Sequence, residues 1–197
     1  MSKMKKTFIY NLKKYAQQNN VPIIQDEGLE FLLQQIKENS IKTVLEIGSA
    51  IGYSAINMAL ENIKVITIER DYFMYEKTLA NIKEAEVEQL VFPIYGDALT
   101  VDVSGKFDLI FIDAAKAQYI KFFEKYKNNL SENGIIVCDN LDFHYLDPSK
   151  VSRSTRQLLK KIEKFKEFLQ NNKEFETVIH HVGDGMSVSK RRSNWSI

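Results

Sequence analysis

The feature of this sequence that most restricts its fold is a series of five short apolar runs. They are TVLEIG, KVITIE, LVFPIYG, FDLIFID and GIIVCDN, at residues 43–48, 64–69, 90–96, 107–113 and 134–140. Each run has the length of a strand and is almost continuously apolar, which is typical of parallel strands covered by helices on both faces. Helical stretches separate the first three runs and the last two, whereas the stretch between the third and fourth runs has a weak helical pattern or none.

The segments on either side of these runs complete the predicted architecture. Helical spacing predicts helices over about 3–19, from an N-capping Asp26 onward, and over about 151–172. The last stretch, FETVIHHVGDGMSVSK, predicts two strands around a Gly-Asp-Gly turn, which is typical of an antiparallel hairpin. We therefore expect an α/β fold with a Rossmann-like, seven-stranded and mainly parallel sheet, an antiparallel C-terminal strand, and helices on both faces.

Composition excludes several classes of protein. With 197 residues, 44% of them apolar, the chain is long enough for one domain with a sizeable core. The formal net charge of +1 does not indicate a partner, and the single cysteine, Cys138, excludes an intramolecular disulfide. We find no signal peptide and no run approaching the roughly 18–20 apolar residues of a membrane span. These observations predict a cytoplasmic protein that does not associate with a membrane.

The first apolar run leads into a turn whose spacing differs from that of phosphate-binding loops. Its pattern, E-x-G-x-x-x-G from Glu46 to Gly52, lacks both the G-x-G-x-x-G fingerprint and the Walker lysine. A nucleoside ligand without a pyrophosphate fits this turn better. Glu69, at the end of the second run, can accept hydrogen bonds from ribose hydroxyls, and Asp97, after the third, can reach an adenine amino group. Each of these features alone could be structural, but together they end three successive strands at one edge of the sheet.

Oxygen-bearing side chains follow the fourth and fifth runs. Asp113 ends the fourth, and Asp139 and Asn140 end the fifth. Neighbouring parallel strands would bring these oxygens to one rim, where a hard cation such as Mg²⁺ is the favoured occupant and Mn²⁺ or Ca²⁺ the alternatives. Lys116, three residues beyond Asp113, is a candidate general base or oxyanion partner. The structural alternatives are a solvated lysine and an ordinary Asp-Asn turn.

Four motifs carry a resemblance to a known family. LEIGSAIGYSA, IER, GDA and FIDAAK resemble the class I S-adenosylmethionine-dependent methyltransferases, and more narrowly the metal-dependent catechol and caffeoyl-CoA O-methyltransferases, over about residues 15–191. The resemblance implies one domain over 1–197, in which the helices of residues 1–40 cover the cofactor and substrate side. It implies catalysis by Lys116 and Asp113 and a metal held by Asp113, Asp139 and Asn140. The residues that it implies for S-adenosylmethionine are Glu46, Gly48, Ser54, Glu69, Asp97, Ala98 and Asp113.

The sequence constrains the acceptor of the methyl group less than it constrains the donor. Chelation by a metal needs two adjacent oxygens, which a catechol and a 5-hydroxyuridine both offer. Seven basic residues and one acid lie between Lys150 and Lys166. Helical spacing places four basic residues on the face opposite an apolar one, and these are the candidate RNA-binding residues: Arg153, Arg156, Lys160 and Lys164. Such a face can hold a phosphate backbone, or it can be an ordinary solvated surface.

A closer resemblance favours RNA. VPIIQDEGLEFLLQQI, FIDAAKAQYIKFFEKY and VGDGMSVSKR are most similar to the bacterial tRNA 5-hydroxyuridine methyltransferases. This similarity implies that the anticodon region of tRNA is the substrate, with 5-methoxyuridine formed at wobble position 34, and that the protein forms a homodimer. Beside many of these relatives, which carry an extra leading helix able to form a dimer or cover the cofactor, this chain looks shorter at the front, so the similarity does not extend to those two roles. The alternatives are a small-molecule catechol O-methyltransferase and a non-enzymatic nucleotide- or RNA-binding protein, although a pure binder would not need the acid and lysine set.

The sequence allows more than one role for several aromatic and histidine side chains. Three aromatic residues could stack on a flipped-out base or lie in the core: Tyr53, Phe143 and Tyr145. We expect His144 to line the substrate mouth, and His180 and His181 to be structural residues of a strand.

Overall fold

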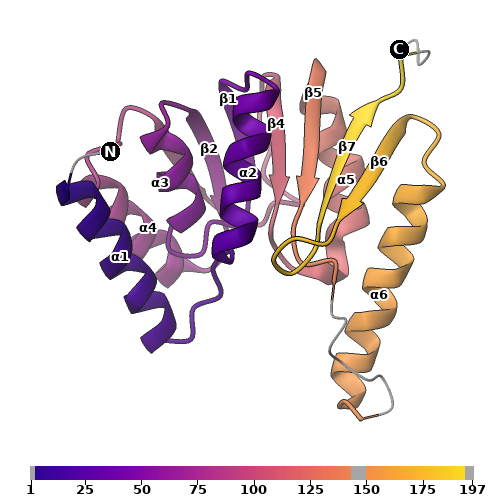
Figure 1. The fold of residues 1–197 in the computed structure, drawn as a ribbon, viewed down its shortest axis with the longest axis horizontal. Helices are drawn as coiled ribbons and strands as arrows, with labels where there is room; N and C mark the ends of the chain where they lie inside the picture. Colours follow the sequence, from indigo (N-terminus) through magenta and orange to yellow (C-terminus); the bar gives the residue numbers. More distant parts are fainter. Residues whose placement is uncertain (1–2, 143–149, 194–197) are drawn as a thin grey trace.

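The seven-stranded sheet has the predicted mainly parallel arrangement (Figure 1). The computed structural model describes residues 3–142 and 150–193, and the sheet order is β3-β2-β1-β4-β5-β7-β6. Strands β1 to β5 pair in parallel, and β7 is antiparallel to both β5 and β6. The fold class is therefore confirmed, including the antiparallel strand near the C-terminus. The strands are β1 Thr43–Ile47, β2 Lys64–Glu69, β3 Val91–Tyr95, β4 Phe107–Ile112, β5 Leu130–Cys138, β6 Phe175–His180 and β7 Met186–Arg191.

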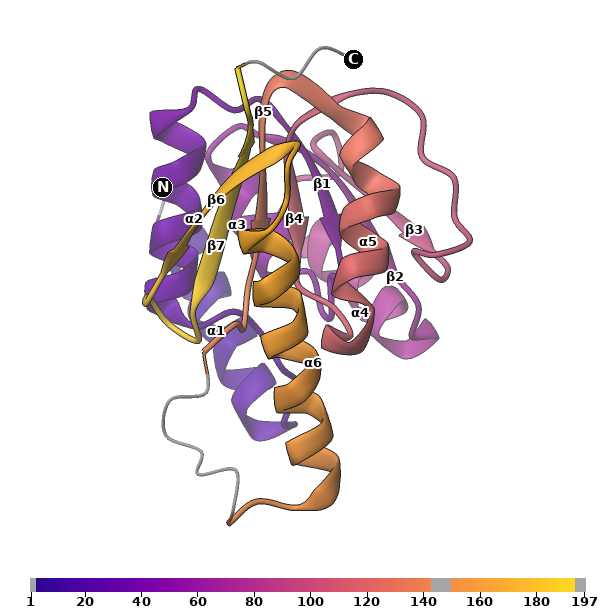
Figure 2. The same cartoon turned by 90° about the vertical axis from the view of Figure 1, so that its right-hand side faces the viewer.

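Helices cover both faces of this sheet (Figure 2). The α-helices are α1 Lys3–Gln18, α2 Asp26–Glu38, α3 Tyr53–Leu60, α4 Tyr72–Glu84, α5 Tyr119–Tyr126 and α6 Arg153–Gln170, and the short 3₁₀ helices are η1 Lys116–Gln118 and η2 Lys127–Asn129. Helices α1 to α4 contribute to one buried apolar cluster, and α5 and α6 contribute to the other. Among the described residues, no helix is long and apolar enough to cross a bilayer.

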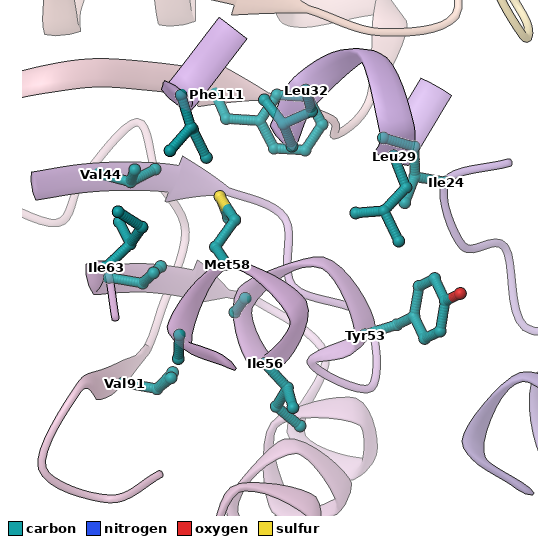
Figure 3. Close-up of a cluster of buried hydrophobic side chains, with 14 of the residues drawn as sticks. Ile24, Leu29, Leu32, Val44, Tyr53, Ile56, Met58, Ile63, Val91 and Phe111 are labelled. Atoms are coloured by element: carbon teal, nitrogen blue, oxygen red, sulfur yellow. The ribbon is translucent and has the colours of Figure 1, made fainter. Parts of the chain in front are cut away.

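The first cluster packs α2 and α3 onto the sheet (Figure 3). Leu32 of α2 and Met58 of α3 are completely buried with Val44 and Phe111 of the central strands. Leu45, the next residue after Val44, belongs to the cluster on the opposite face because successive strand side chains alternate. The central strand is thus buried on both sides, as its continuous apolar sequence predicts.

The second cluster is built largely from aromatic rings. The four residues that the sequence places on one face of α5 are all buried: Tyr119, Phe122, Phe123 and Tyr126. The ring of Phe165 on α6 contacts Tyr119 at a centroid distance of 5.2 Å, and Phe175 of β6 contacts Phe123 at 5.1 Å. Edge-to-face pairs of this kind add to the apolar burial that packs α5 against α6 and against β6.

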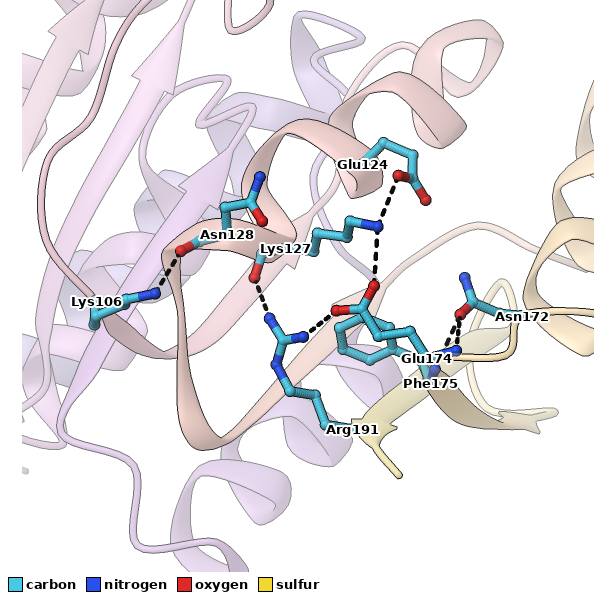
Figure 4. Close-up of polar contacts among 8 residues, drawn as sticks. All are labelled: Lys106, Glu124, Lys127, Asn128, Asn172, Glu174, Phe175 and Arg191. Carbon is cyan, nitrogen blue, oxygen red and sulfur yellow. Dashed lines mark hydrogen bonds and ion pairs between the residues drawn. The ribbon is translucent and has the colours of Figure 1, made fainter. Parts of the chain in front are cut away.

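A polar network joins the segment before β5 to the start of β6 and the end of β7 (Figure 4). Glu174, just before β6, accepts hydrogen bonds from Arg191 of β7 and, at 2.9 Å, from the Lys127 ammonium. Lys127 also lies 2.9 Å from Glu124. Arg191 donates a further hydrogen bond of 2.7 Å to the carbonyl oxygen of Lys127. This network lies at the end of the sheet opposite the carboxyl ends of β1 to β5.

Some predicted boundaries were wrong. Asp26 is the first residue of α2 and not its cap, since Gln25 occupies the N-cap position and the Asp26 carboxylate pairs with Lys13. Helix α6 is shorter at both ends than predicted, and Ser152 caps it by accepting a 3.2 Å hydrogen bond from the amide of Thr155. His181 lies beyond the end of β6, so the prediction that it belongs to a strand was wrong. Only turns connect β3 to β4, as the weak helical pattern predicts.

Candidate functional site

A cavity of about 610 Å³ opens at the carboxyl ends of the parallel strands. It lies where the strand order reverses between β1 and β4, which is where ligands bind in open α/β sheets. The segment from Val21 to Gln25, just before α2, forms one wall. The cavity brings together most of the predicted site residues: Gly48, Ser54, Glu69, Asp97, Ala98, Asp113, Lys116 and Asn140.

The turn after β1 can be formed only by glycine at its first position. Gly48 has φ of +95°, and a Cβ atom there would lie 2.2 Å from the carbonyl oxygen of Asp113. The rest of the turn is held from α4, where Thr78 Oγ1 donates to the carbonyl of Ala50 and Asn81 Nδ2 to that of Ile51, both at 2.8 Å. A well-anchored turn with no side chain at Gly48 therefore faces the cavity, as a closely held ligand requires.

Two carboxylates mark the ends of β2 and β3. Glu69 is the last residue of β2, and its two oxygens accept hydrogen bonds from the amides of Ala50 at 2.9 Å and Asp71 at 2.8 Å. Asp97 lies two residues after β3 instead of at its end, and it accepts a 2.8 Å hydrogen bond from the amide of Leu99. Both carboxylates are fixed at the cavity wall and keep lone pairs for hydroxyl or amino donors.

Glu46 lies behind the cavity wall and not on it. Its carboxylate is completely buried and accepts hydrogen bonds from the hydroxyls of Ser54 and Thr67. Burial, and to a smaller extent the negative charges of Asp113 and Glu69, raise the pKa of Glu46 to about 7, although the hydrogen bonds from Ser54 and Thr67 oppose the increase. Because Ser54 does line the cavity, the structure gives Glu46 the position of a residue that orients Ser54.

The predicted metal and catalytic residues meet at the ends of β4 and β5. The amide of Asp139 donates a 3.1 Å hydrogen bond to the carbonyl of Ile112, which ties the two strand ends together. Lys116 Nζ donates to Asn140 Oδ1 at 2.8 Å. Burial raises the pKa of both Asp113 and Asp139, and the negative charge of Asp113 raises that of Asp139 further. The rim thus holds the half-buried carboxylate of Asp113 on the cavity wall and the buried carboxylate of Asp139 behind it, and Lys116 supplies compensating positive charge for both.

The oxygen atoms of this rim fit a hard divalent cation. Asp113, Asp139 and Asn140 offer carboxylate and amide oxygens only, the donors that Mg²⁺ prefers, and burial disfavours the ionised form of both carboxylates, a cost that a bound cation would offset. Within residues 3–142 and 150–193, no group of three or more His, Cys, Asp or Glu side chains is arranged to hold a metal. A metal here would therefore rely on the amide oxygen of Asn140 as well as on the two carboxylates.

The sequence reasoning missed Asp184. This residue of the β6–β7 turn lines the same cavity and accepts hydrogen bonds from Gln25 Nε2 at 2.7 Å and from Asn140 Nδ2 at 3.3 Å. A signal was present in the sequence, because an antiparallel last strand paired with the fifth run must begin at the rim where that run ends. The Gly-Asp-Gly turn before it would then lie beside Asp139 and Asn140.

The tentative RNA-binding residues lie on α6 and do not line the cavity. Arg153, Arg156, Lys160 and Lys164 are exposed, whereas Ile162, Phe165 and Leu169 of the same helix are buried. The first half of α6 extends beyond the carboxyl ends of the parallel strands (Figures 1 and 2). Its basic side chains therefore lie on the side of the molecule where the cavity opens.

The remaining aromatic and histidine residues have mixed placements. Tyr53 is 4% exposed and lines the cavity. The ring of His180 packs on Phe31 of α2 at a centroid distance of 4.7 Å, and His181 contacts the buried carboxylate of Asp142. Phe143, His144 and Tyr145 lie outside the described residues.

Known proteins resemble this chain over nearly its whole length. Residues 1–192 match a protein family described as O-methyltransferase. A caffeoyl-CoA O-methyltransferase from Populus kitakamiensis is 29% identical, in an alignment that covers 91% of this chain and 82% of that relative. A solved Staphylococcus aureus structure, provisionally described as a caffeoyl-CoA O-methyltransferase, is 37% identical, has a TM-score of 0.87, and is matched over 93% of this chain and 92% of that one. The SAH-bound methyltransferase PaMTH1 of Podospora anserina shares the fold, with 22% identity, a TM-score of 0.85, and coverage of 98% and 89% of the two chains.

Proposed function

Because this chain belongs to the O-methyltransferase family, we propose that it transfers a methyl group from S-adenosylmethionine to a hydroxyl of 5-hydroxyuridine at position 34 of tRNA. The observation that carries this proposal is the meeting of three features at one rim of the sheet. These are a nucleoside-sized cavity, the oxygen and lysine set at Asp113, Asn140 and Lys116, and the exposed basic face of α6.

The cavity supports S-adenosylmethionine as the donor. The backbone at Gly48 would let a ligand approach without meeting a side chain, and the fixed carboxylates of Glu69 and Asp97 can accept hydrogen bonds from ribose hydroxyls and an adenine amino group. The SAH-bound state of the Podospora relative, which has the same fold, is consistent with this donor. The turn contains no three-glycine pyrophosphate fingerprint, which would be expected for a dinucleotide.

The rim supplies alignment and charge for the transfer. Lys116 takes the proton of the acceptor hydroxyl or stabilises the oxyanion that remains, while Asp113, Asp139 and Asn140 would hold Mg²⁺. A bound Mg²⁺ supplies positive charge that lowers the pKa of the acceptor hydroxyl. The oxygen lone pair then forms the bond to the methyl carbon as the sulfur–methyl bond breaks, leaving S-adenosylhomocysteine. Holding donor and acceptor in line accounts for much of the rate gain in such reactions.

The basic face of α6 supports an RNA acceptor. Arg153 and Arg156 lie in the first two turns of the helix, on the part that extends beyond the strand ends (Figure 2). Arginine and lysine side chains in such positions can contact phosphates while a nearby base enters the cavity. We also carry forward, as a prediction, the homodimer that the family resemblance implies.

A small catechol is the second candidate acceptor. The Populus and Staphylococcus relatives are described as caffeoyl-CoA O-methyltransferases, and a catechol offers the same two adjacent oxygens as 5-hydroxyuridine. The oxygen and lysine set would serve both acceptors in the same way, whereas a small catechol without phosphate groups would not use the basic face of α6.

The two acceptors can be separated with one set of purified proteins. We expect the enzyme with S-adenosylmethionine and Mg²⁺ to convert 5-hydroxyuridine of tRNA to 5-methoxyuridine, measured by nucleoside mass spectrometry, and to stop when a chelator removes the metal. The double variant Arg153→Ala/Arg156→Ala should lower tRNA methylation about tenfold or more and leave catechol turnover unchanged. The matched control is Lys83→Ala/Lys106→Ala, which removes two exposed lysines near the opposite end of the sheet. Unmodified tRNA with rapid catechol methylation would favour the second candidate, and activity that survives the chelator would remove the metal from the proposal.

A further inference from the structure

The carboxylate of Asp184 joins two elements that meet at the cavity. It accepts a hydrogen bond from Asn140 Nδ2, at the end of β5, and another from Gln25 Nε2, at the start of α2. We propose that Asp184 is a positioning residue that fixes the side-chain amide of Asn140 for the reaction. This inference rests on the proposed function, because it assigns Asn140 to the acceptor and metal side of the site.

The two partners of Asn140 leave its amide only one orientation. In its ammonium form Lys116 can only donate, so it faces the amide oxygen, at 2.8 Å. An ionised Asp184 can only accept, so it must face the amide nitrogen, at 3.3 Å. Without Asp184, rotation of the amide by 180° would replace the oxygen at the rim with an NH₂ group, which cannot bind a cation.

The backbone next to Asn140 is hydrogen-bonded to the β6–β7 turn, which contains Asp184. Asn140 has φ of +62°, and its backbone N–H donates a 2.7 Å hydrogen bond to Asp139 Oδ1. The β6–β7 turn is fastened to the next residues of the same segment. There, the amide of Leu141 donates to the carbonyl of Gly185 at 2.9 Å, and the amide of Asp142 donates to that of Asp184 at 2.7 Å. The turn therefore holds the Asp184 carboxylate at a fixed place relative to Asn140.

Gln25 extends this arrangement to the donor side of the cavity. It is the last residue of the Val21–Gln25 wall and occupies the N-cap position of α2. Through Asp184, the wall that covers the donor cavity is connected to the amide that faces Lys116. Partners of this kind, placed behind a ligand, commonly change metal affinity by 10- to 100-fold when they are removed.

An exchange of the two side chains tests the role directly. Asp184→Asn leaves one acceptor oxygen for two amide donors, Asn140 Nδ2 and Gln25 Nε2, so it removes the fixed acceptor that orients Asn140. Adding Asn140→Asp exchanges the two side chains, so that the amide at position 184 donates and the carboxylate at position 140 accepts. The double variant keeps the total charge of the parent and still has an oxygen facing Lys116. In the double variant, the amide oxygen introduced at position 184 can go on accepting from Gln25. Glu176→Gln, at an exposed position of β6, is the control for loss of one carboxylate.

We would measure Mn²⁺ binding to the SAH-bound full chain by electron paramagnetic resonance of the free ion. We expect Asp184→Asn to bind Mn²⁺ about 10- to 100-fold more weakly, Glu176→Gln to bind as the parent does, and the double variant to recover most of the loss. Unchanged binding by Asp184→Asn, or a double variant that binds Mn²⁺ no better than Asp184→Asn does, would overturn the proposal.

Urea unfolding of the same proteins without metal separates this inference from the proposed function. The midpoint of the double variant should lie closer to that of the parent than the summed shifts of the two single variants. A parent that binds no Mn²⁺ would refute the metal part of the proposed function alone. Additive urea midpoints would refute the contact between residues 140 and 184 and, with it, the positioning role.

Discussion

Replacing Glu46 by glutamine should stabilise the folded chain at pH 8 by about 3 kcal/mol. Burial raises the pKa of this carboxyl from 4.5 to about 7, so the folded chain resists its ionisation while the unfolded chain does not. Each pKa unit of difference corresponds to about 1.4 kcal/mol, and at pH 8 the group is ionised in both states. The charged carboxylate therefore destabilises the wild-type fold by an amount on the order of 3 kcal/mol, which a neutral amide would avoid.

The sign of the pH dependence follows from the same values. The contribution of neutral Glu46 to stability is fully present below pH 4.5 and is lost as the pH rises through about 7. Between pH 5 and pH 8 the advantage of the Glu46→Gln variant should widen by about 2 to 3 kcal/mol. The amide can replace the carboxylate without losing its partners, because the hydroxyls of Ser54 and Thr67 can each donate or accept.

Urea unfolding of the cofactor-free protein at pH 5, 6, 7 and 8 would measure this difference. The control, Glu176→Gln, changes an exposed glutamate on β6 and should leave the unfolding free energy within about 0.5 kcal/mol of the parent. If the gap between Glu46→Gln and the parent stays constant from pH 5 to pH 8, the raised pKa is wrong. If the variant is less stable at every pH, the two hydroxyls do not adapt to the amide.

Two further predictions concern the turn after β1 and the buried thiol. Gly48→Ala should cost about 3 kcal/mol or more of unfolding free energy and abolish SAH binding, because its Cβ would lie 2.2 Å from the backbone oxygen of Asp113. Gly105 also has a positive φ, of +99°, but a Cβ atom there would meet no atom within 4 Å. Gly105→Ala should therefore lower the unfolding free energy by only about 1–2 kcal/mol, and equal losses of unfolding free energy in the two variants would refute the steric argument. Cys138 is completely buried and burial raises its pKa to about 12, so a disulfide reagent at pH 8 should modify it only in urea. Rapid modification of the native chain would contradict the burial of β5.

The strands and the shared rim of the site were predictable from local patterns. Five apolar runs of strand length are long enough to identify a buried parallel sheet, and all five form β1 to β5. The carboxyl ends of parallel strands must meet at one edge, so Asp113 and Asn140 were expected to lie close together, and Lys116 joins them through Asn140. These inferences depend only on side-chain periodicity and chain direction, which the sequence contains.

The tertiary structure alone decided how side chains from distant segments pair. Gln25 and Asp184 are 159 residues apart in the sequence and yet share a hydrogen bond. Asp184, in the β6–β7 turn, likewise contacts Asn140, which follows β5. Glu46 occurs in the motif expected to contact the donor, yet it lies behind Ser54. Such contacts depend on strand order, on register and on where loops return to the sheet. No local pattern specifies these quantities, because the free energy that fixes them comes from the packing of the whole core.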